Sequence, residues 1–562
     1  MAGFGMERAQ GGPPTPKPIS MRTVIAASTA GTTFEWYDFF TFGALTPVIA
    51  KNFFAALDPT AGLLAALALF GAGFFFRPIG ALIFGRLGDR LGRKGAFLIT
   101  ISMMGGATFA IGLLPTWPQA GLVAPMLLVL MRIIQGTALG GQYGGAAIYV
   151  AEHAPSGKRG VMTGWIQTSA AFGLVGALAV IFVARSSLGE ARFTAPGWAA
   201  GWRLPFLLSA GLLAISVWMR LKLTESPAFA KLTAAGARAK APYAEAFGKW
   251  PNLKVVLVAF IAFMCAQGAA WYALFFYAEQ VFLERFMKVD PATGAGLLLA
   301  MTVASAPLYV AFAWLSDKVG RKWVMWFGMT VSLAFFFPGF HALAHLANPA
   351  LEAAQARTPV TVLADPARCS LQFDVIGKAK FLSSCDLAKS ALANAGVSYR
   401  NAEAPPGALA VVKIGPLVVP SAEGAGLAGP ALESAAHQVG LRLAAALNAA
   451  GYPAKADPAR VNFWGLFAVL MVFVVGATAL YGPMAATLVE LFPTKIRYTA
   501  LSLPYHIGTG WVGGFMPVTA FAIVTATGDI YSGLWYPLIF TAISVVALPF
   551  VLPETKQRAI DE

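Results

Sequence analysis

Two acidic side chains lie inside an apolar stretch near the start of the chain. Glu35 and Asp38 occur in TTFEWYDFFTFG, and their spacing of three residues places them on one face of a helix. Ionisable groups in an apolar helix are costly to bury, so they mark a functional site. Burial and a nearby arginine act in opposite directions on the proton affinity of a carboxyl group, which lets such a group exchange a proton. Asp38 is our first candidate for proton coupling and Glu35 the second.

Further polar groups interrupt other apolar runs. Arg132 lies at a depth compatible with that of the two acids, and we hypothesise that it faces Glu35 and Asp38, where its charge is available to a carboxylate or an anionic substrate; the alternative is a permanent ion pair. His506 is a candidate second proton site because histidine titrates near neutral pH, although a lone histidine is more often a packing residue. The other candidates for substrate binding, which would otherwise be packing residues, are Gln135, Gln142, Tyr143, Tyr37, Gln267, Trp271, Tyr272 and Tyr505.

The composition explains what positions these groups. The 562 residues are 57% hydrophobic and only 12% charged, which excludes an ordinary soluble enzyme. Apolar runs of about 20 residues, each long enough to cross a bilayer as a helix, recur twelve times between residues 22 and 552. Lys and Arg gather in alternate connections and place both termini in the cytoplasm. The net charge of +15 is therefore a topology signal and does not predict a nucleic-acid partner.

Two charged loops each occur twice. RLGDRLGRKG (86–95) recurs as WLSDKVGRKW (314–323), and AEHAPSGKR (151–159) recurs as VELFPTKIR (489–497). The second pair lies about 110 residues further apart than the first, so an insertion of that size separates parts of the second repeat. Opposite charges in these loops can pair in one conformation and separate in another, which predicts gates; the alternative is a solvated charge cluster. The candidate gating residues are Asp89, Arg93, Glu152, Arg159, Asp317, Arg321, Glu490 and Arg497.

These observations predict an all-α membrane protein of twelve helices in two pseudo-symmetric six-helix halves, with a small extracytoplasmic α+β insertion between helices 9 and 10. The C-terminal half echoes EWYDFF as AWYALFF without either acid, so charge handling is expected to be confined to the first half. The expected segments are a disordered tail (1–21), the N-terminal half (22–222), a cytoplasmic linker (223–252), helices 7–9 (253–347), the insertion (348–460), helices 10–12 (461–552) and a second tail (553–562).

The insertion contains two of the three cysteines, Cys369 and Cys385. Because an extracytoplasmic compartment permits disulfides, we expect these two to be bonded. ALAVVKIGPLVV (408–419) predicts a strand or hairpin, and ALESAAHQVGLRLAAALNAAG (431–451) predicts an amphipathic helix. Such a cap is either a structural lid or a substrate-capturing element. The cysteine positions suggest no shared metal site, and nothing indicates a cofactor.

The two halves with their repeated G-R-K loops resemble the major facilitator superfamily. TTFEWYDFFTFG, FFFRPIGALIFGRLGDRLGRK, RIIQGTALGGQYGGA and RLKLTESPAF occur in order and are similar to the metabolite:proton symporter family, whose members import small charged solutes such as osmolytes and organic acids. The resemblance implies a gating role for the charged loops, Arg90 included. The family commonly has Glu where this chain has Gln142; if that Glu takes part in coupling in relatives, coupling in this chain rests on other groups or is absent. Arg77, near the cytoplasmic side, is either a gating or an anchoring residue.

The sequence thus predicts proton-coupled import of a small anionic or zwitterionic metabolite across the inner (plasma) membrane. Its expected partners are that substrate, protons and the lipid bilayer, and we expect a monomer without cofactor or metal. A proton-driven exporter and a uniporter are the alternatives within the transporter class. A sensor that uses the external cap is the alternative from another class, but the cytoplasmic segments are too short for a signalling domain. A membrane enzyme would need a cluster of reactive groups that the sequence does not suggest.

Overall fold

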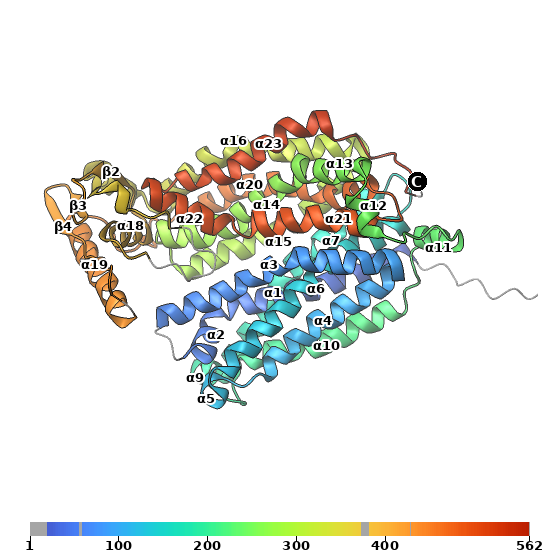
Figure 1. The fold of residues 1–562 in the computed structure, drawn as a ribbon, viewed down its shortest axis with the longest axis horizontal. Coiled ribbons are helices and arrows are strands. Elements are labelled where there is room, and N and C mark those ends of the chain that lie inside the picture. The colour runs from blue at the N-terminus through green and yellow to red at the C-terminus, as the bar shows by residue number, and fades with distance from the viewer. Residues whose placement is uncertain (1–19, 56–58, 373–380, 428, 561–562) are drawn as a thin grey trace, which may run out of the picture.

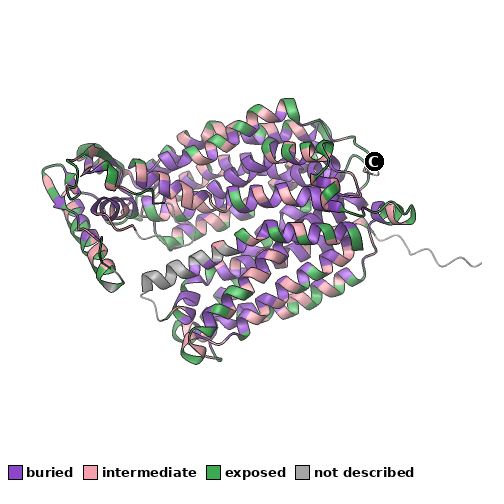
Figure 2. Cartoon of the chain, in the orientation of Figure 1, coloured by how far each residue is buried: buried purple, intermediate pink, exposed green. Residues whose placement is uncertain are grey.

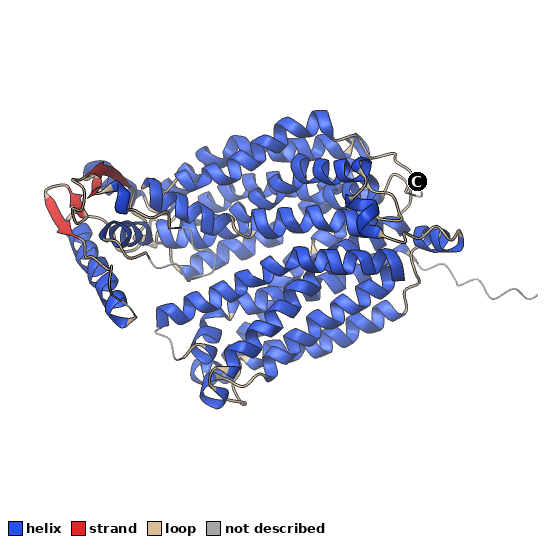
Figure 3. Ribbon diagram, in the orientation of Figure 1, coloured by secondary structure: helices blue, strands red, loops and turns tan. Residues whose placement is uncertain are grey.

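The computed structural model describes residues 20–55, 59–372, 381–427 and 429–560. The long helices run side by side in one bundle, with the C-terminus at one end and the strands of the described chain at the other (Figures 1 and 3). We call these the terminal end and the cap end. Of the two expected tails, residues 1–19 and 561–562 lie outside the described residues.

Within the described chain, ten helical stretches are long and apolar enough to cross a membrane, and α1 and α3 complete the twelve-helix architecture. The N-terminal half consists of α1 (Met21–Ala44), α2 (Thr46–Phe53), α3 (Pro59–Leu91), α4 (Arg93–Leu113), α6 (Val123–His153), α7 (Arg159–Gln167), α8 (Ser169–Leu188) and α10 (Arg203–Leu221), with the short α5 (Trp117–Ala120) and α9 (Glu190–Thr194) at its cap end. The connection between the halves carries α11 (Pro227–Ala234) and α12 (Pro242–Phe247).

The C-terminal half departs from regular α-helix in two of its spans. Its seventh helical path runs through α13 (Trp250–Ala259), the π-helix η1 (Phe260–Met264), α14 (Cys265–Tyr272) and the π-helix η2 (Ala273–Phe286). The eleventh path likewise passes from α21 (Arg497–His506) through the π-helix η4 (Ile507–Gly513) to α22 (Met516–Thr527). Single-turn π-bulges are frequent at functional sites, and η2 is much longer than one turn. The regular helices of this half are α15 (Pro291–Val319), α16 (Arg321–Ala347), α20 (Phe463–Leu491) and α23 (Trp535–Val551), which follows the 3-10 turn η5 (Ser532–Leu534).

Glycine allows α3 and α6 to pack with their backbones in contact. A Cβ atom added to Gly80 would lie 1.9 Å from the carbonyl oxygen of Thr137, and one added to Gly140 would lie 2.2 Å from that of Arg77. Small residues let membrane helices approach this closely without a hydrophobic driving force between them. Buried residues accordingly fill the space between the helices, while exposed residues lie on the outer surface and on the cap helix α19 (Pro430–Ala449) (Figure 2).

The repeated sequence loops are also repeated structures. Gly92 and Gly320 precede α4 and α16 with φ angles of +113° and +114°, a backbone conformation that residues other than glycine rarely adopt. In each loop a distant carboxylate caps the helix that follows. Glu225 accepts a hydrogen bond from the main-chain NH of Arg93 (3.1 Å), and Glu554 accepts one from that of Arg321 (2.9 Å). A carboxylate at this position offsets the positive end of the helix dipole.

The insertion folds into a cap at one end of the bundle. Its four strands are β1 (Val360–Ala364), β2 (Tyr399–Glu403), β3 (Val411–Ile414) and β4 (Leu417–Pro420), in the sheet order β2-β1-β3-β4. β3 and β4 form the antiparallel hairpin that the sequence predicts, and the predicted amphipathic helix is α19. Two further helices, α17 (Pro349–Arg357) and α18 (Ser384–Asn394), complete the cap, and Cys369 and Cys385 are joined by a disulfide.

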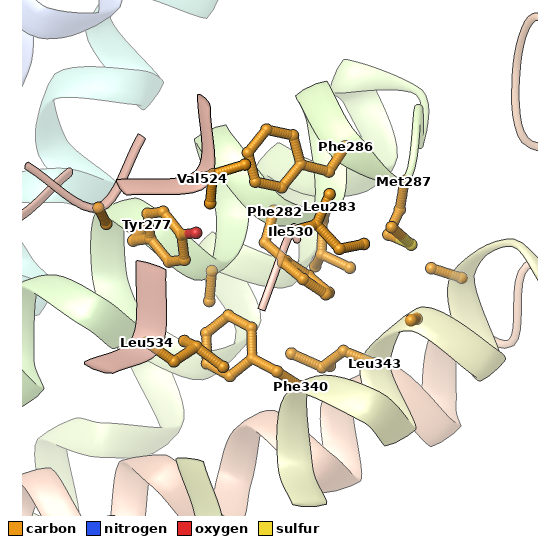
Figure 4. Close-up of a cluster of buried hydrophobic side chains, with 14 of the residues drawn as sticks. Tyr277, Phe282, Leu283, Phe286, Met287, Phe340, Leu343, Val524, Ile530 and Leu534 are labelled. Atoms are coloured by element: carbon orange, nitrogen blue, oxygen red, sulfur yellow. The ribbon is translucent and has the colours of Figure 1, made fainter. Parts of the chain in front are cut away.

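The cap is attached to the C-terminal half. Its main chain bonds to that half where Tyr399 NH donates to the carbonyl of Gly528 (2.7 Å) and Ala456 NH donates to that of Lys288 (3.1 Å). One hydrophobic cluster runs through both parts, and Figure 4 shows Phe282, Phe286 and neighbouring residues within it. Burial of this apolar surface joins the cap to the C-terminal half as one packed unit.

Candidate functional site

The two acids of α1 lie buried inside the N-terminal half. Glu35 is 5% exposed and Asp38 is 4% exposed, and neither forms an ion pair within 4.0 Å in the described part of the chain. Asp38 Oδ1 accepts a hydrogen bond from Ser209 Oγ of α10 (2.8 Å). The positive charges that act on Glu35 are those of Arg77 on α3 and Arg220 on α10. Two carboxyl groups therefore sit in an apolar interior where proton binding and electrostatic pairing can alternate.

Arg132 does not face the two acids as the sequence analysis expected. Its guanidinium donates to Gln135 Oε1 (2.9 Å) and lies 4.1 Å from the ring centroid of Phe42. Gln135 in turn donates to Thr108 (2.6 Å). The sequence analysis estimated only how deep Arg132 lies along its helix. The direction in which the side chain points around the helix axis decides its partner, and the depth does not determine that direction. Arg77 is buried, with its guanidinium carbon 5.5 Å from the ring centroid of Phe74, and it lines a small cavity together with Glu35.

A cavity of about 200 Å³ lies between the two halves. Its walls come from α1, α2, α8, α14, η2 and α15, and most of the lining is apolar and aromatic. Trp271, which the sequence analysis proposed for substrate binding, lines this cavity and donates to the hydroxyl of Tyr309 (3.1 Å). The polar groups in the lining are supplied by Tyr309, Gln280, Thr302, Ser305 and Thr46. Few polar groups in an apolar cavity are typical of a small-molecule site.

Three tyrosines pack together next to the cavity-lining residue Tyr309, whose ring lies 5.7 Å from that of Tyr481 between centroids. Tyr143 of the N-terminal half stacks on Tyr505 of the C-terminal half with ring centroids 4.0 Å apart. The hydroxyl groups of Tyr505 and Tyr481 are 2.9 Å apart, and Gln167 donates to the hydroxyl of Tyr143 (2.8 Å). Tyr143 and Tyr505 are among the residues predicted to bind substrate, whereas Tyr481 was missed because an aromatic residue in an apolar run carries no distinguishing signal. This stack is a direct contact between the two halves.

The remaining candidates lie at separate places in the interior. Tyr272 packs edge-on against Phe74 of the N-terminal half (5.7 Å between centroids), and Tyr37 donates to the carbonyl of Pro205 (2.8 Å) within its own half. Gln267 and His506 are buried in the C-terminal half. Gln142 is fully buried and lies with Glu35 and Asp38 around a small cavity.

Charge is also buried in the C-terminal half, contrary to the expectation from the sequence. Glu279 of η2 is 4% exposed and shares a hydrogen bond with the carboxyl group of Glu284. Both carboxyl groups approach Gly294 of α15, where an added Cβ would lie 3.2 Å from Glu279 Oε1 and 2.7 Å from Glu284 Oε1. In a π-helix the main-chain bonds join residues five apart, so the two side chains lie one turn apart. The α-helical spacing used in the sequence analysis does not place them together.

At the terminal end, acidic residues of each half hold the start of a helix in the other half. Asp89 accepts hydrogen bonds from the main-chain NH groups of Tyr498 (3.1 Å) and Thr499 (2.8 Å), at the start of α21. Asp317 does the same at the start of α7, where two main-chain NH groups lie 2.9 and 2.7 Å from its carboxylate. Each acid also pairs with an arginine of its own loop, Arg93 (2.8 Å) and Arg321 (2.6 Å).

Ion pairs between the second pair of repeated loops complete this contact. Glu152 pairs with Arg497 across the halves (2.6 Å), and Glu490 lies 3.2 Å from Arg321 and 3.7 Å from Arg159. These side chains are buried, so solvent does not screen them. The network joins both loop pairs in a pseudo-symmetric ring at one end of the bundle. Arg90, by contrast, is exposed, and its carbonyl accepts a bond from Arg238 (3.3 Å).

The sequence analysis missed the hydroxyl groups and acids that extend this ring. Ser226 donates to Glu152 (2.5 Å), and Thr555 donates to Glu490 (2.8 Å). Both hydroxyl residues follow directly on the capping acids Glu225 and Glu554, in the segments LTES and LPET. The similarity of these two four-residue segments was the available signal, and it is short.

A helical bundle of two such halves, closed at one end and hollow between them, defines a membrane transporter.

Comparison with known proteins agrees with this class. The profile of the sugar (and other) transporter family matches residues 23–246 and 437–562, and the chain belongs to this family, a branch of the major facilitator superfamily. It is 35% identical over 327 residues to the shikimate transporter of Escherichia coli strain K12, which covers 57% of this chain and 72% of that protein. It is 32% identical over 330 residues to the proline/betaine transporter of the same strain, covering 57% and 64%.

The solved structures agree in fold. The proton:xylose symporter XylE, bound to 6-bromo-6-deoxy-D-glucose, matches with a TM-score of 0.59 at 15% identity, over 96% of this chain and 98% of that one. At this identity the similarity concerns the fold alone. The family match and the curated relatives identify the protein as a multi-pass membrane transporter of the major facilitator superfamily, and not an enzyme.

Proposed function

We propose that the protein imports a small anionic or zwitterionic metabolite together with protons across the bacterial inner membrane. The observation that carries this proposal is the pair of buried acids, Glu35 and Asp38, which have no ion-pair partner within 4.0 Å among the described residues. A buried carboxyl group without such a partner is favoured in its protonated form. Asp38 is the main proton carrier and Glu35 the second, and both lie on the same helix as the cavity-lining residues Phe39 and Phe40.

Transport would proceed by alternating access. We place the terminal end in the cytoplasm, where the positive charges of the connecting loops favour it. In the conformation described here, the ring around Asp89, Asp317, Glu152 and Glu490 joins the two halves at that end. Substrate would then enter from the cap end and leave after the ring opens, with the two halves rocking about a site near the middle of the membrane.

The buried charges support the substrate class. The guanidinium groups of Arg77 and Arg220, whose charges act on Glu35, lie buried in membrane-spanning helices of the same half. A protonated acid leaves a neighbouring arginine uncompensated, and an anionic group of the substrate restores neutrality. Relatives of the chain are a shikimate transporter and a proline/betaine transporter, and these names denote one anionic and two zwitterionic compounds.

Uptake into proteoliposomes tests the proposal. Organic acids, shikimate-like compounds, betaines and amino acids are offered with an inward proton gradient, with and without an uncoupler. We expect one class to accumulate and the uncoupler to abolish its accumulation. Asp38→Asn should lose this driven uptake and retain substrate exchange, whereas Asp457→Asn, an acid in the loop after the cap helix, should behave as the wild-type protein. Equilibration without accumulation in the wild-type protein would indicate a uniporter instead.

A further inference from the structure

A second, much smaller cavity lies against the two acids of α1. Its volume is about 10 Å³, and its polar walls are formed by Glu35, Asp38, Gln142 and Ser209. Apolar side chains of α4 and α10 close the remaining sides. A space of this size accommodates a single water molecule and nothing larger.

Gln142 has unmet hydrogen-bonding capacity in this cavity. Its side chain is fully buried, and both its Nε2 and Oε1 atoms have no hydrogen-bond partner among the described residues. Oε2 of Glu35 likewise has no hydrogen-bond partner among the described residues. Burying amide and carboxyl atoms without partners is costly, and a bound water that both donates and accepts would satisfy all three atoms.

We propose that Gln142 positions one water molecule that bridges Glu35 and Asp38 and passes a proton between them. This inference rests on the proposed function, because it concerns the path of the coupled proton. Gln142 neither gains nor loses a proton and is therefore a positioning residue. Its amide donates to the water oxygen through Nε2 and accepts a water hydrogen at Oε1, which fixes the water between the two carboxyl groups.

The proton moves from Glu35 to Asp38 through the bound water. Protonated Glu35 gives its proton to the water oxygen, while the water gives one of its own protons to the carboxylate of Asp38. The water is regenerated, Glu35 becomes a carboxylate, and Asp38 becomes neutral. The titratable and charged groups that act on the two acids are Arg77, Arg220, Tyr37, Tyr498 and Tyr505.

Two substitutions of equal length separate the polar role of Gln142 from its volume. Gln142→Met fills the same space without a hydrogen-bonding group, and Gln142→Glu keeps one. We expect Q142M to lose at least tenfold of proton-driven uptake relative to substrate exchange, since positioned proton transfer contributes factors of about 10² or more. Q142E should keep driven uptake but with a shifted pH profile. Thr100→Val is the matched control, because Thr100 is equally buried and donates only to a main-chain carbonyl, that of Phe97.

An infrared measurement on the wild-type protein tests the water itself. Difference spectra between acidic and alkaline pH should contain a water O–H band that shifts in H₂¹⁸O and is absent from Q142M. If the band is missing from the wild-type protein, or if Q142M keeps the wild-type ratio of driven uptake to exchange, the proposal is overturned. The band does not depend on transport, so its presence in a protein without proton-driven uptake would refute the proposed function and retain the water site.

Discussion

Replacing Glu152 with glutamine should open the ring at the terminal end. The pair of Glu152 with Arg497 joins the halves at 2.6 Å, and both side chains are buried. Removing one partner of a buried pair costs about 3–5 kcal/mol. Arg497 keeps main-chain acceptors on Phe492 (2.9 Å) and Ile560 (2.7 Å), so the lower figure, about 3 kcal/mol, applies. Once the ring opens, water solvates both groups and the cost disappears, so the closed conformation alone is destabilised, by roughly 150-fold in the equilibrium between the two.

Pulsed electron paramagnetic resonance measures this change. Spin labels at the exposed positions Ser156 and Lys318, one on each half at the terminal end, report the separation of the halves. We expect a short distance in the wild-type protein and a population shift to a longer one in Glu152→Gln. Glu423→Gln is the control, because it removes an ion pair of the same length, with Arg368, that lies wholly within the cap. An unchanged distance distribution in Glu152→Gln would refute the assignment of this pair to the gate.

Three further predictions test other parts of the structure. Cys385→Ser removes a disulfide that closes a 16-residue separation, which should cost about 3 kcal/mol in the cap and speed its digestion in limited proteolysis. In the wild-type protein, the carboxyl groups of Glu279 and Glu284 share a hydrogen bond only while one of them is protonated, whereas the amide of Glu279→Gln donates at every pH. The melting temperature should therefore fall at alkaline pH in the wild-type protein and fall less in the variant. Equal falls would contradict the pairing. Gly80→Val should abolish folding, since its Cβ would overlap α6, while Gly106→Ala, with no atom within 4 Å of its Cβ, should leave the melting temperature unchanged or slightly higher.

The fold could be predicted from the sequence because its determinants are periodic or repeated. Apolar runs set the helices, and the two repeated loops set the pseudo-symmetry, which the matching conformations of Gly92 and Gly320 confirm. The partner of Arg132 could not be predicted, because distance along a helix axis gives depth but no direction around the axis. The pairing of Glu279 with Glu284 required a π-helix, and the sequence gives no sign of that geometry.

If the two halves rock as proposed above, the cap has a mechanical consequence. The cap is packed on the C-terminal half and hydrogen-bonded to its main chain at Gly528 and Lys288, so it moves together with that half. Displacement in a rotation grows with distance from the pivot, and α19 lies at the far end of the molecule (Figure 1). A small rotation in the membrane therefore becomes a long sweep of α19 outside it. Any rigid obstacle in the path of α19 would therefore slow the transport cycle.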